Sequence, residues 1–176
     1  MTTKGSVSTR IRDAGLCGRA VRGFAFLFAL AVAMGCGPIG PFSGGRLSGD
    51  EGGWPEDWNR VADVTQIQLE TGPEDPYSVN VWFVVVDDEA YIATSLLMGP
   101  EVPEEREWVQ NIAADPRVRI RIEGILYSAR LETVTDSSSR TRVFEAFHVK
   151  YPELEVSRVD AARFFRVVKR VAATMP

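Results

Sequence analysis

The stretch that decides the fold is YSVNVWFVVVDDEAYIATS, residues 77–95 of the 176-residue chain. Residues 77–86 form a nearly continuous run of β-branched and aromatic residues, which is typical of a strand buried on both faces. The acidic residues 87–89 predict a tight turn, and residues 90–95 return as the partner strand. The stretch therefore predicts a β-hairpin whose first strand is central in its sheet.

Alternating apolar and polar residues predict half-buried strands on both sides of this hairpin. Residues 65–71 alternate in this way, with glutamines and a glutamate on the polar side. In residues 117–122, valine and isoleucine alternate with three arginines. Glu123-Gly124 then turns the chain into a long partner strand over residues 125–134, so a second hairpin is expected.

Two helices are expected between the strands. Pro103, followed by two acidic residues, starts the first helix, and an apolar stripe at helical spacing continues it as far as Asp115-Pro116. Either Thr135 or Asp136 caps the second helix, which covers residues 137–150.

A last strand is expected at residues 163–172, which gives the order strand-strand-strand-helix-strand-strand-helix-strand. Several hairpins with only two inserted helices predict a mainly β (α+β) protein built on an antiparallel barrel, rather than a doubly wound parallel sheet. We expect one compact domain at residues 61–176, because the exported part of the chain is long enough for one core and not for two.

The N-terminal residues 1–35 have the order of an export signal. A positively charged leader precedes an apolar run at 23–34, which is shorter than the ~20 residues that span a bilayer as a helix. The run ends in Ala33-Met34-Gly35-Cys36, which resembles a lipobox with alanine in place of the usual leucine. The resemblance implies that Cys36 becomes the lipidated N-terminus. An ordinary cleaved secretory signal is the alternative.

Residues 36–60 are rich in glycine, proline, serine and acidic residues, which predicts an extended tether between the lipid and the domain. Trp54 and Trp58 interrupt this composition. We expect both rings to pack onto the folded domain, because each buries a large apolar area. Contact with a ligand is the alternative.

Composition excludes several kinds of site. Cys17 lies in the leader and Cys36 at its end, so the exported chain forms no internal disulfide and offers no thiolate to a metal. His148 is the only histidine, and no Gly-x-Ser-x-Gly turn presents a nucleophilic serine. Removing the leader leaves 15 basic and 23 acidic residues, a formal charge of −8, which argues against nucleic acid or an anionic membrane surface as a binding partner, because both demand clustered Lys and Arg.

The hairpin at 77–95, the Trp108-x-x-Asn111 pair and the exit Asp115-Pro116-x-Val118 resemble the flavin-binding split β-barrel superfamily. This superfamily includes the pyridoxamine 5'-phosphate oxidase-like (PNPOx-like) proteins and the deazaflavin-dependent nitroreductases. The resemblance covers roughly residues 61–171 and lacks a strongly basic phosphate cluster. It implies an antiparallel split barrel, FMN or a deazaflavin as cofactor, and a homodimer that places the cofactor between its subunits.

Seven residues are candidates for binding this cofactor. The two polar residues on the first hairpin strand suit the ring edge, and two hydroxyls with one arginine suit the phosphate through charge-assisted hydrogen bonds. Each also has a structural alternative, above all the tryptophan as a core residue and the second asparagine as a partner of neighbouring backbone. The candidates are Ser78, Asn80, Thr94, Ser95, Arg106, Trp108 and Asn111.

These observations leave two functions open. The first is a lipid-anchored protein of the bacterial cell envelope that binds a flavin-type cofactor and transfers hydride to a small organic acceptor. The second is a non-enzymatic envelope lipoprotein that keeps the barrel as a ligand-binding or interaction module. By resemblance to lipoprotein sorting in bacteria with two membranes, Gly37 instead of aspartate after the cysteine implies the outer membrane.

Overall fold

The computed structural model describes residues 37–94, 102–152 and 162–170. The chain divides into two compact units, Met1–Met34 and Gly35–Pro176, and everything below concerns the second. The predicted export signal, Cys36 and Ser95 lie outside the described residues.

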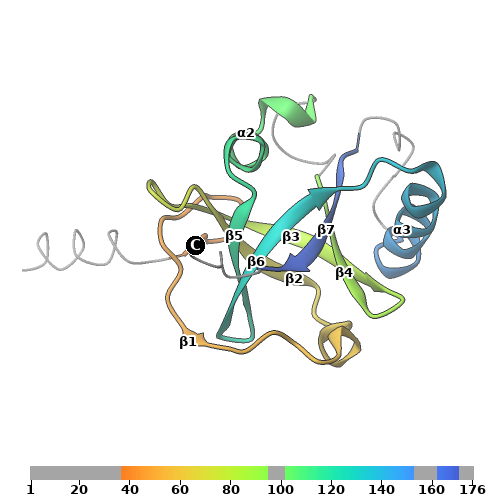
Figure 1. The fold of residues 1–176 in the computed structure, drawn as a ribbon, viewed down its shortest axis with the longest axis horizontal. Helices are drawn as coiled ribbons and strands as arrows, with labels where there is room; N and C mark the ends of the chain where they lie inside the picture. The colour runs from red at the N-terminus through yellow and green to blue at the C-terminus, as the bar shows by residue number, and fades with distance from the viewer. Residues whose placement is uncertain (1–36, 95–101, 153–161, 171–176) are drawn as a thin grey trace, which may run out of the picture. The chain divides into compact units, whose positions relative to one another are not determined.

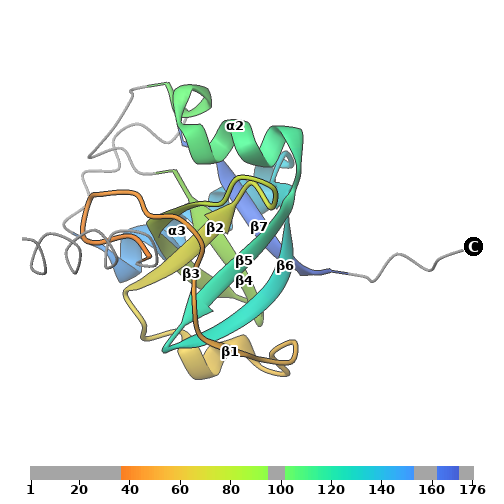
Figure 2. The same ribbon diagram turned by 90° about the vertical axis from the view of Figure 1, so that its left-hand side faces the viewer.

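Six antiparallel strands close into a barrel (Figures 1 and 2). They follow one another around the barrel in the order β6-β5-β2-β3-β4-β7, and β7 pairs with β6 to complete the circle. A short strand, β1, runs parallel to β6 outside this circle. The strands are β1 (Asp50–Glu51), β2 (Gln66–Thr71), β3 (Tyr77–Val86), β4 (Glu89–Ala93), β5 (Arg117–Ile122), β6 (Ile125–Thr133) and β7 (Phe164–Lys169).

The predicted central hairpin is confirmed as β3 and β4, with Val86 opposite Glu89. Asp87 and Asp88 form the two-residue turn, and both have left-handed backbone angles, with φ values of 52° and 61°. A two-residue turn with two positive φ values matches the twist of its flanking strands, and aspartate tolerates that conformation better than most residues.

The alternation predicted for β2 and β5 is also confirmed. In β5 the apolar residues Val118, Ile120 and Ile122 are buried, while the arginines between them are half-buried on the outer face. The barrel interior is filled by apolar side chains from all six strands. Among them are Ile67, Leu69, Val81, Phe83, Ala90, Ile92, Val118, Ile120, Ala129, Leu131, Phe165 and Val167.

One end of the barrel is closed by α2 (Glu107–Ala114), which follows the short 3-10 helix η2 (Pro103–Glu105). Trp108, Val109 and Ile112 are buried and belong to the interior cluster. The Trp108 ring lies 5.5 Å from that of Phe165 in an edge-to-face arrangement. This helix therefore acts as a plug for the end at which β2 turns into β3.

The opposite end is closed by the 3-10 helix η1 (Trp58–Val61). The Trp58 side chain is buried, and its ring lies 5.5 Å from that of Trp54 and 6.2 Å from that of Tyr127. The Trp58 N–H donates to the Asp88 carboxylate over 2.7 Å, which fixes η1 to the β3–β4 turn. The predicted packing of both tryptophans onto the domain is confirmed.

The second helix, α3 (Ser137–Lys150), lies on the outer face of the barrel. Asp136 is its cap, because its carboxylate accepts a hydrogen bond from the Ser139 N–H over 2.8 Å. Val143 and Phe147 of the helix pack on the outward-facing residues of β3, β4 and β7 and form a second, smaller core. No helix in the described parts of the chain is long and apolar enough to cross a membrane.

Residues 37–52, here named the strap, differ most from expectation. Apart from the two-residue strand β1, they lack regular helix or strand, but they lie against the outer face of β2, β3 and β5 instead of running free as a tether would. Leu47 is 2% exposed and its N–H donates to the Glu70 carboxylate over 2.5 Å. The strap follows the sheet because side chains of the barrel bind its backbone.

Candidate functional site

The barrel is open along one edge near the α2 end. Strand β4 pairs with β3 from Phe83 to Val86, so residues 77–82 of β3 are not paired by any described residue of β4. Ser78 and Asn80 lie in this unpaired half, and Thr94 follows the end of β4. The topology therefore brings these candidate residues to the same end of the barrel.

Ser78 is fully buried in the open edge. Its N–H donates to the Gly44 carbonyl and its carbonyl accepts from the Gly44 N–H, both over 2.8 Å. Because backbone bonds alternate sides along a strand, Gly44 occupies the side of β3 that β4 leaves open. The Ser78 hydroxyl has no hydrogen-bond partner among the described residues, an arrangement that costs about 1–3 kcal/mol for a buried polar group.

Asn80 also contacts the strap. Its side-chain N–H donates to the Gly40 carbonyl over 2.9 Å. The amide that the sequence placed at the ring edge is thus already engaged by the chain itself. Together, Ser78 and Asn80 show that the strap covers the ring-edge part of the predicted site.

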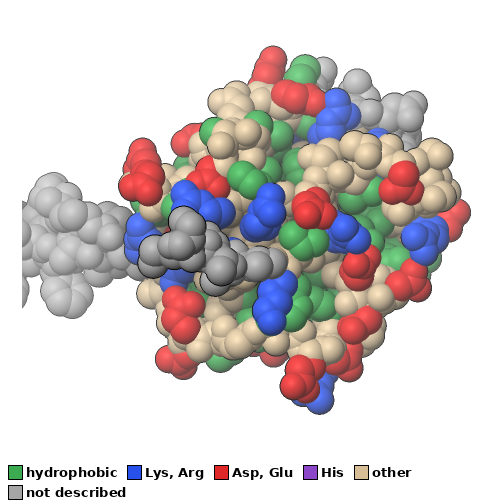
Figure 3. Space-filling view, in the orientation of Figure 1, with side chains coloured by type: hydrophobic (Ala, Val, Ile, Leu, Met, Phe, Trp, Pro, Cys, Tyr) green, Lys and Arg blue, Asp and Glu red, His purple; other side chains and the backbone are tan. Residues whose placement is uncertain are grey.

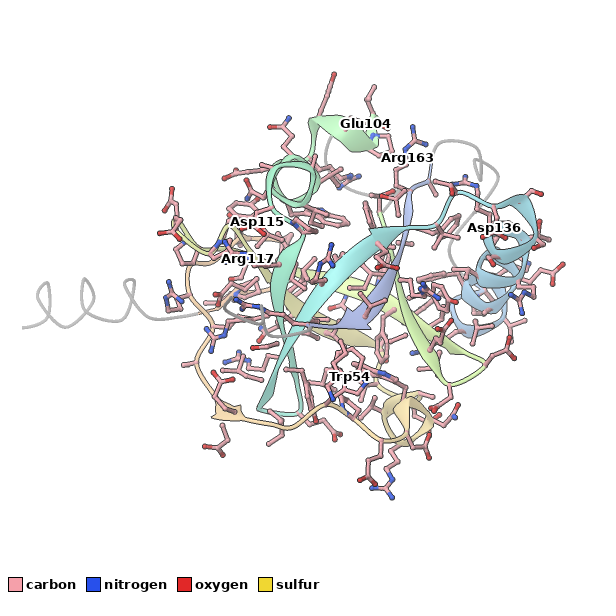
Figure 4. The ribbon with its side chains drawn as sticks, in the orientation of Figure 1. Trp54, Glu104, Asp115, Arg117, Asp136 and Arg163 are labelled. Carbon is pink, nitrogen blue, oxygen red and sulfur yellow. The ribbon has the colours of Figure 1, made fainter. Side chains whose placement is uncertain are left out.

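Thr94, which follows β4, forms hydrogen bonds with the backbone of Arg163, which precedes β7. Its hydroxyl accepts from the Arg163 N–H and its own N–H donates to the Arg163 carbonyl, each over 3.0 Å. The Arg163 guanidinium forms an ion pair with Glu104 of η2, and the two side chains point toward each other in Figure 4. Sequence reasoning missed Arg163, because only the barrel closure places it beside Thr94.

Arg106 links η2 to α2 and is half-buried. Burial lowers the pKa of its guanidinium, which nevertheless stays charged near neutral pH because arginine ordinarily titrates far above it. Arg106 lies two residues after Glu104, the partner of Arg163. The α2 end therefore carries two arginines and the Thr94 hydroxyl, groups that suit an anion.

The remaining candidates have structural contacts. Trp108 belongs to the core, as its alternative reading held. The Asn111 side-chain N–H donates to the Thr71 hydroxyl over 3.1 Å, and that hydroxyl donates to the Tyr77 carbonyl over 3.2 Å. Asn111 therefore fixes α2 to the β2–β3 turn through a side chain, where neighbouring backbone was the expected partner.

Charge on the barrel surface is mixed. On the face seen in Figure 3, Lys and Arg side chains are interspersed with Asp and Glu. At the edge of α2, Arg117 pairs with Asp115, and this guanidinium holds the pKa of the Asp115 carboxyl below its usual value (Figure 4). An anionic ligand would thus depend on individual arginines and not on a basic patch.

A second polar site lies beside the start of α3. It is a cavity of about 160 Å³, and three of its residues, Tyr91, Arg166 and Glu132, lie side by side across β4, β7 and β6. Burial and the neighbouring Glu89 raise the pKa of Tyr91 to about 12. The cavity is lined by Tyr91, Glu132, Thr133, Val134, Thr135, Asp136, Ser139 and Arg166. No cluster of potential metal ligands occurs among the residues that the structure describes.

The closed antiparallel barrel with its two helices is a split β-barrel of the PNPOx-like kind, as the sequence predicted. The chain belongs to the family DUF2255, described as an uncharacterized protein conserved in bacteria, which matches residues 57–171. No curated protein matches the chain.

Several solved structures of bacterial proteins are similar to this chain. A conserved hypothetical protein of Mycobacterium tuberculosis is 20% identical over 66% of this chain and 82% of its own, with a TM-score of 0.51. An FAD-binding protein of Mesorhizobium loti is 17% identical over 64% and 87%, with a TM-score of 0.46. A Listeria innocua protein assigned provisionally as a pyridoxamine 5'-phosphate oxidase is 12% identical over 63% and 88%, with a TM-score of 0.48. At these identities, similarity extends to the fold alone.

Proposed function

We propose that this chain is a lipid-anchored protein of the bacterial cell envelope whose barrel binds a flavin-type cofactor, FMN or a deazaflavin, at the α2 end. The observation that carries the proposal is the half-buried Arg106 at the α2 end of a split barrel. The fold itself and the resemblance of residues 61–171 to flavin-binding barrels support it. A homodimer that shares the site and an outer-membrane location are parts of the same proposal.

The described residues fit the phosphate of such a cofactor better than its ring. Arg106 and the Thr94 hydroxyl would hold the phosphate, and the buried Ser78 hydroxyl offers an unused hydrogen-bonding group. The ring edge, in contrast, meets the strap at Asn80, so the strap must shift or share this edge with the ring. Bound there, a flavin-type cofactor would supply hydride transfer, while the protein would position it and a small organic acceptor.

A second function is favoured by the strap. The Asn80 side chain and the Ser78 backbone form hydrogen bonds with Gly40 and Gly44 of the strap, so these groups on the β3 edge have partners without a ligand. A barrel whose β3 edge is occupied by its own strap suits a non-enzymatic module that binds another ligand or a partner protein. Cofactor binding separates the two functions.

The test is titration of FMN and a deazaflavin into the purified protein and its Arg106→Ala variant. Loss of a charged hydrogen-bond partner should cost about 1.5–3 kcal/mol, or roughly ten- to a hundredfold in affinity. Arg60→Ala is the matched control, because Arg60 is exposed at the opposite end of the barrel and should leave affinity unchanged. Equal affinities for all three proteins would remove Arg106 from the site.

A further inference from the structure

We propose that residues 39–42, here named the docking turn, place the barrel on the surface of a lipid bilayer. This inference depends on the lipidation of Cys36, which is part of the proposed function. It goes further by assigning a membrane-facing side to the barrel. The strap is then the part of the chain that sets the orientation of the domain.

The docking turn has a fixed shape. The Ile39 N–H donates to the Phe42 carbonyl over 3.1 Å, and the Phe42 N–H donates to the Ile39 carbonyl over 3.0 Å. Gly40 has a φ of 55°, a conformation that favours glycine. Its carbonyl accepts from Asn80 of β3, so the turn is attached directly to the barrel.

The turn exposes two large apolar side chains together. Ile39 is 69% exposed and Phe42 is 74% exposed. The other exposed large hydrophobic residues in the described parts of the chain are Val102, just before η2, and Val149 in α3. Single exposed hydrophobic residues are ordinary, but an adjacent pair held on a rigid turn indicates a surface that is covered by something else.

Distance along the chain identifies a bilayer as the occupant. Ile39 is three positions after Cys36 in the chain, and three residue steps span at most about 11 Å. The headgroup region of one leaflet is about 5–8 Å thick. Acyl chains on Cys36 would therefore hold the two exposed side chains in or beside the headgroup layer, where amphipathic and apolar groups bind.

The strap leaves little freedom between the anchor and the barrel. The Gln68 side-chain N–H donates to the Pro38 carbonyl over 3.2 Å, only two residues after Cys36. An Arg121 guanidinium nitrogen lies 3.3 Å from the position that a Cβ on Gly37 would take. Both partners that the structure gives this guanidinium, Gln68 and the Ser48 carbonyl, are neutral, so its positive charge suits lipid phosphates at this site.

The experiment uses the full-length lipidated protein in vesicles of phosphatidylethanolamine and phosphatidylglycerol. Phe42→Cys supplies the single free thiol of the processed chain and is labelled with an environment-sensitive fluorophore. Val149→Cys is the matched control, because Val149 is apolar, 80% exposed and on α3, away from the strap. Ile39→Cys is a second test position, in case the Phe42 variant is not stably folded.

We expect emission at position 42 to shift to shorter wavelength and to be quenched by nitroxide-labelled lipid, with neither effect at position 149. Equal emission and equal quenching at the two positions would overturn the proposed contact between the docking turn and the bilayer. A shift without quenching would also overturn it, since a second copy of the chain would then cover the turn. Mass spectrometry of the same sample reads the lipid on Cys36, and its absence would overturn the anchor and the docking together. None of these measurements depends on a flavin, so a failure of membrane docking can be told apart from a failure of cofactor binding.

Discussion

Glu70 offers a quantitative test of how the strap stabilises the barrel. It lies on the outward face of β2, yet its side chain is only 3% exposed because the strap covers it. Its carboxylate accepts from the Leu47 N–H over 2.5 Å and from the Arg119 guanidinium over 3.2 Å. Glu70→Gln keeps the shape of the side chain and removes its charge.

The expected loss follows from burial. Breaking a fully buried ion pair costs ~3–5 kcal/mol, and a hydrogen bond to a charged group is worth ~1.5–3 kcal/mol. Arg119 is 23% exposed and keeps Glu51 as a second partner at 2.9 Å. The loss in unfolding free energy caused by Glu70→Gln should therefore be smaller than for a fully buried ion pair. We therefore expect the free energy of unfolding to fall by about 2–3 kcal/mol.

Arg142→Gln is the matched control. Arg142 pairs with Asp87 over 2.7 Å, a shorter distance than the 3.2 Å of Arg119 and Glu70, but these side chains are 56% and 72% exposed. Exposed pairs contribute at most about 1 kcal/mol, so the control should lose less than half as much. Urea denaturation of both variants with equal m values measures the difference. Equal losses would refute the idea that the strap creates a buried charge site.

Three further predictions concern the anchor, the assembly and the pH dependence. Cys36→Ser should release the protein from the membrane fraction or leave it unprocessed, whereas normal processing with parental fractionation would contradict the lipid anchor. The detergent-solubilised protein should sediment as a dimer, and a monomer at tens of micromolar would remove the shared-site arrangement. Burial lowers the pKa of Lys150 to about 8, so the unfolded state binds more protons between pH 8 and about 10.5, and this residue should make the free energy of unfolding rise with pH there. Lys150→Met should lack that rise in denaturation at pH 7.5 and pH 10, and parallel curves for both proteins would contradict the lowered pKa.

The strands and helices were predictable because each carries a local signal. Asp87 and Asp88 mark a turn by type and position, and the alternation in β5 gives both its extent and its buried face. Asp136 likewise marks the start of α3, whereas Pro103 starts the separate 3-10 helix η2 and α2 begins only at Glu107, because Arg106 between them is extended. Element order then followed, and with it an antiparallel barrel, while the family resemblance implied that the barrel is of the split kind.

The strap was not predictable in the same way. Its contacts join side chains of the barrel to its own backbone carbonyls, as in Asn80 to Gly40 and Arg119 to Leu47. Such bonds leave no periodic pattern in the strap sequence, which therefore reads as a linker. Leu47 is buried while Ile39 and Phe42 in the same segment are exposed, so apolar residue type alone did not predict which part of the strap packs on the barrel.

The polar clusters required the register of the strands. Arg163 meets Thr94, and Arg166 lies between Tyr91 and Glu132, only because β7 closes the barrel between β4 and β6. Residues that are more than thirty positions apart cannot be paired from composition or spacing. The candidate residues for the cofactor were therefore found on the hairpin and the first helix, whereas Arg163, just before β7, was missed.

The most direct test of the central claim is the visible absorbance of the protein purified from its own membranes, followed by mass spectrometry of any small molecule that denaturation releases. The proposed function predicts a flavin-type spectrum, or uptake of FMN or a deazaflavin by the colourless protein, and weaker retention in Arg106→Ala. A colourless protein that takes up neither cofactor at any concentration tested would contradict a flavin-binding barrel and favour the non-enzymatic module.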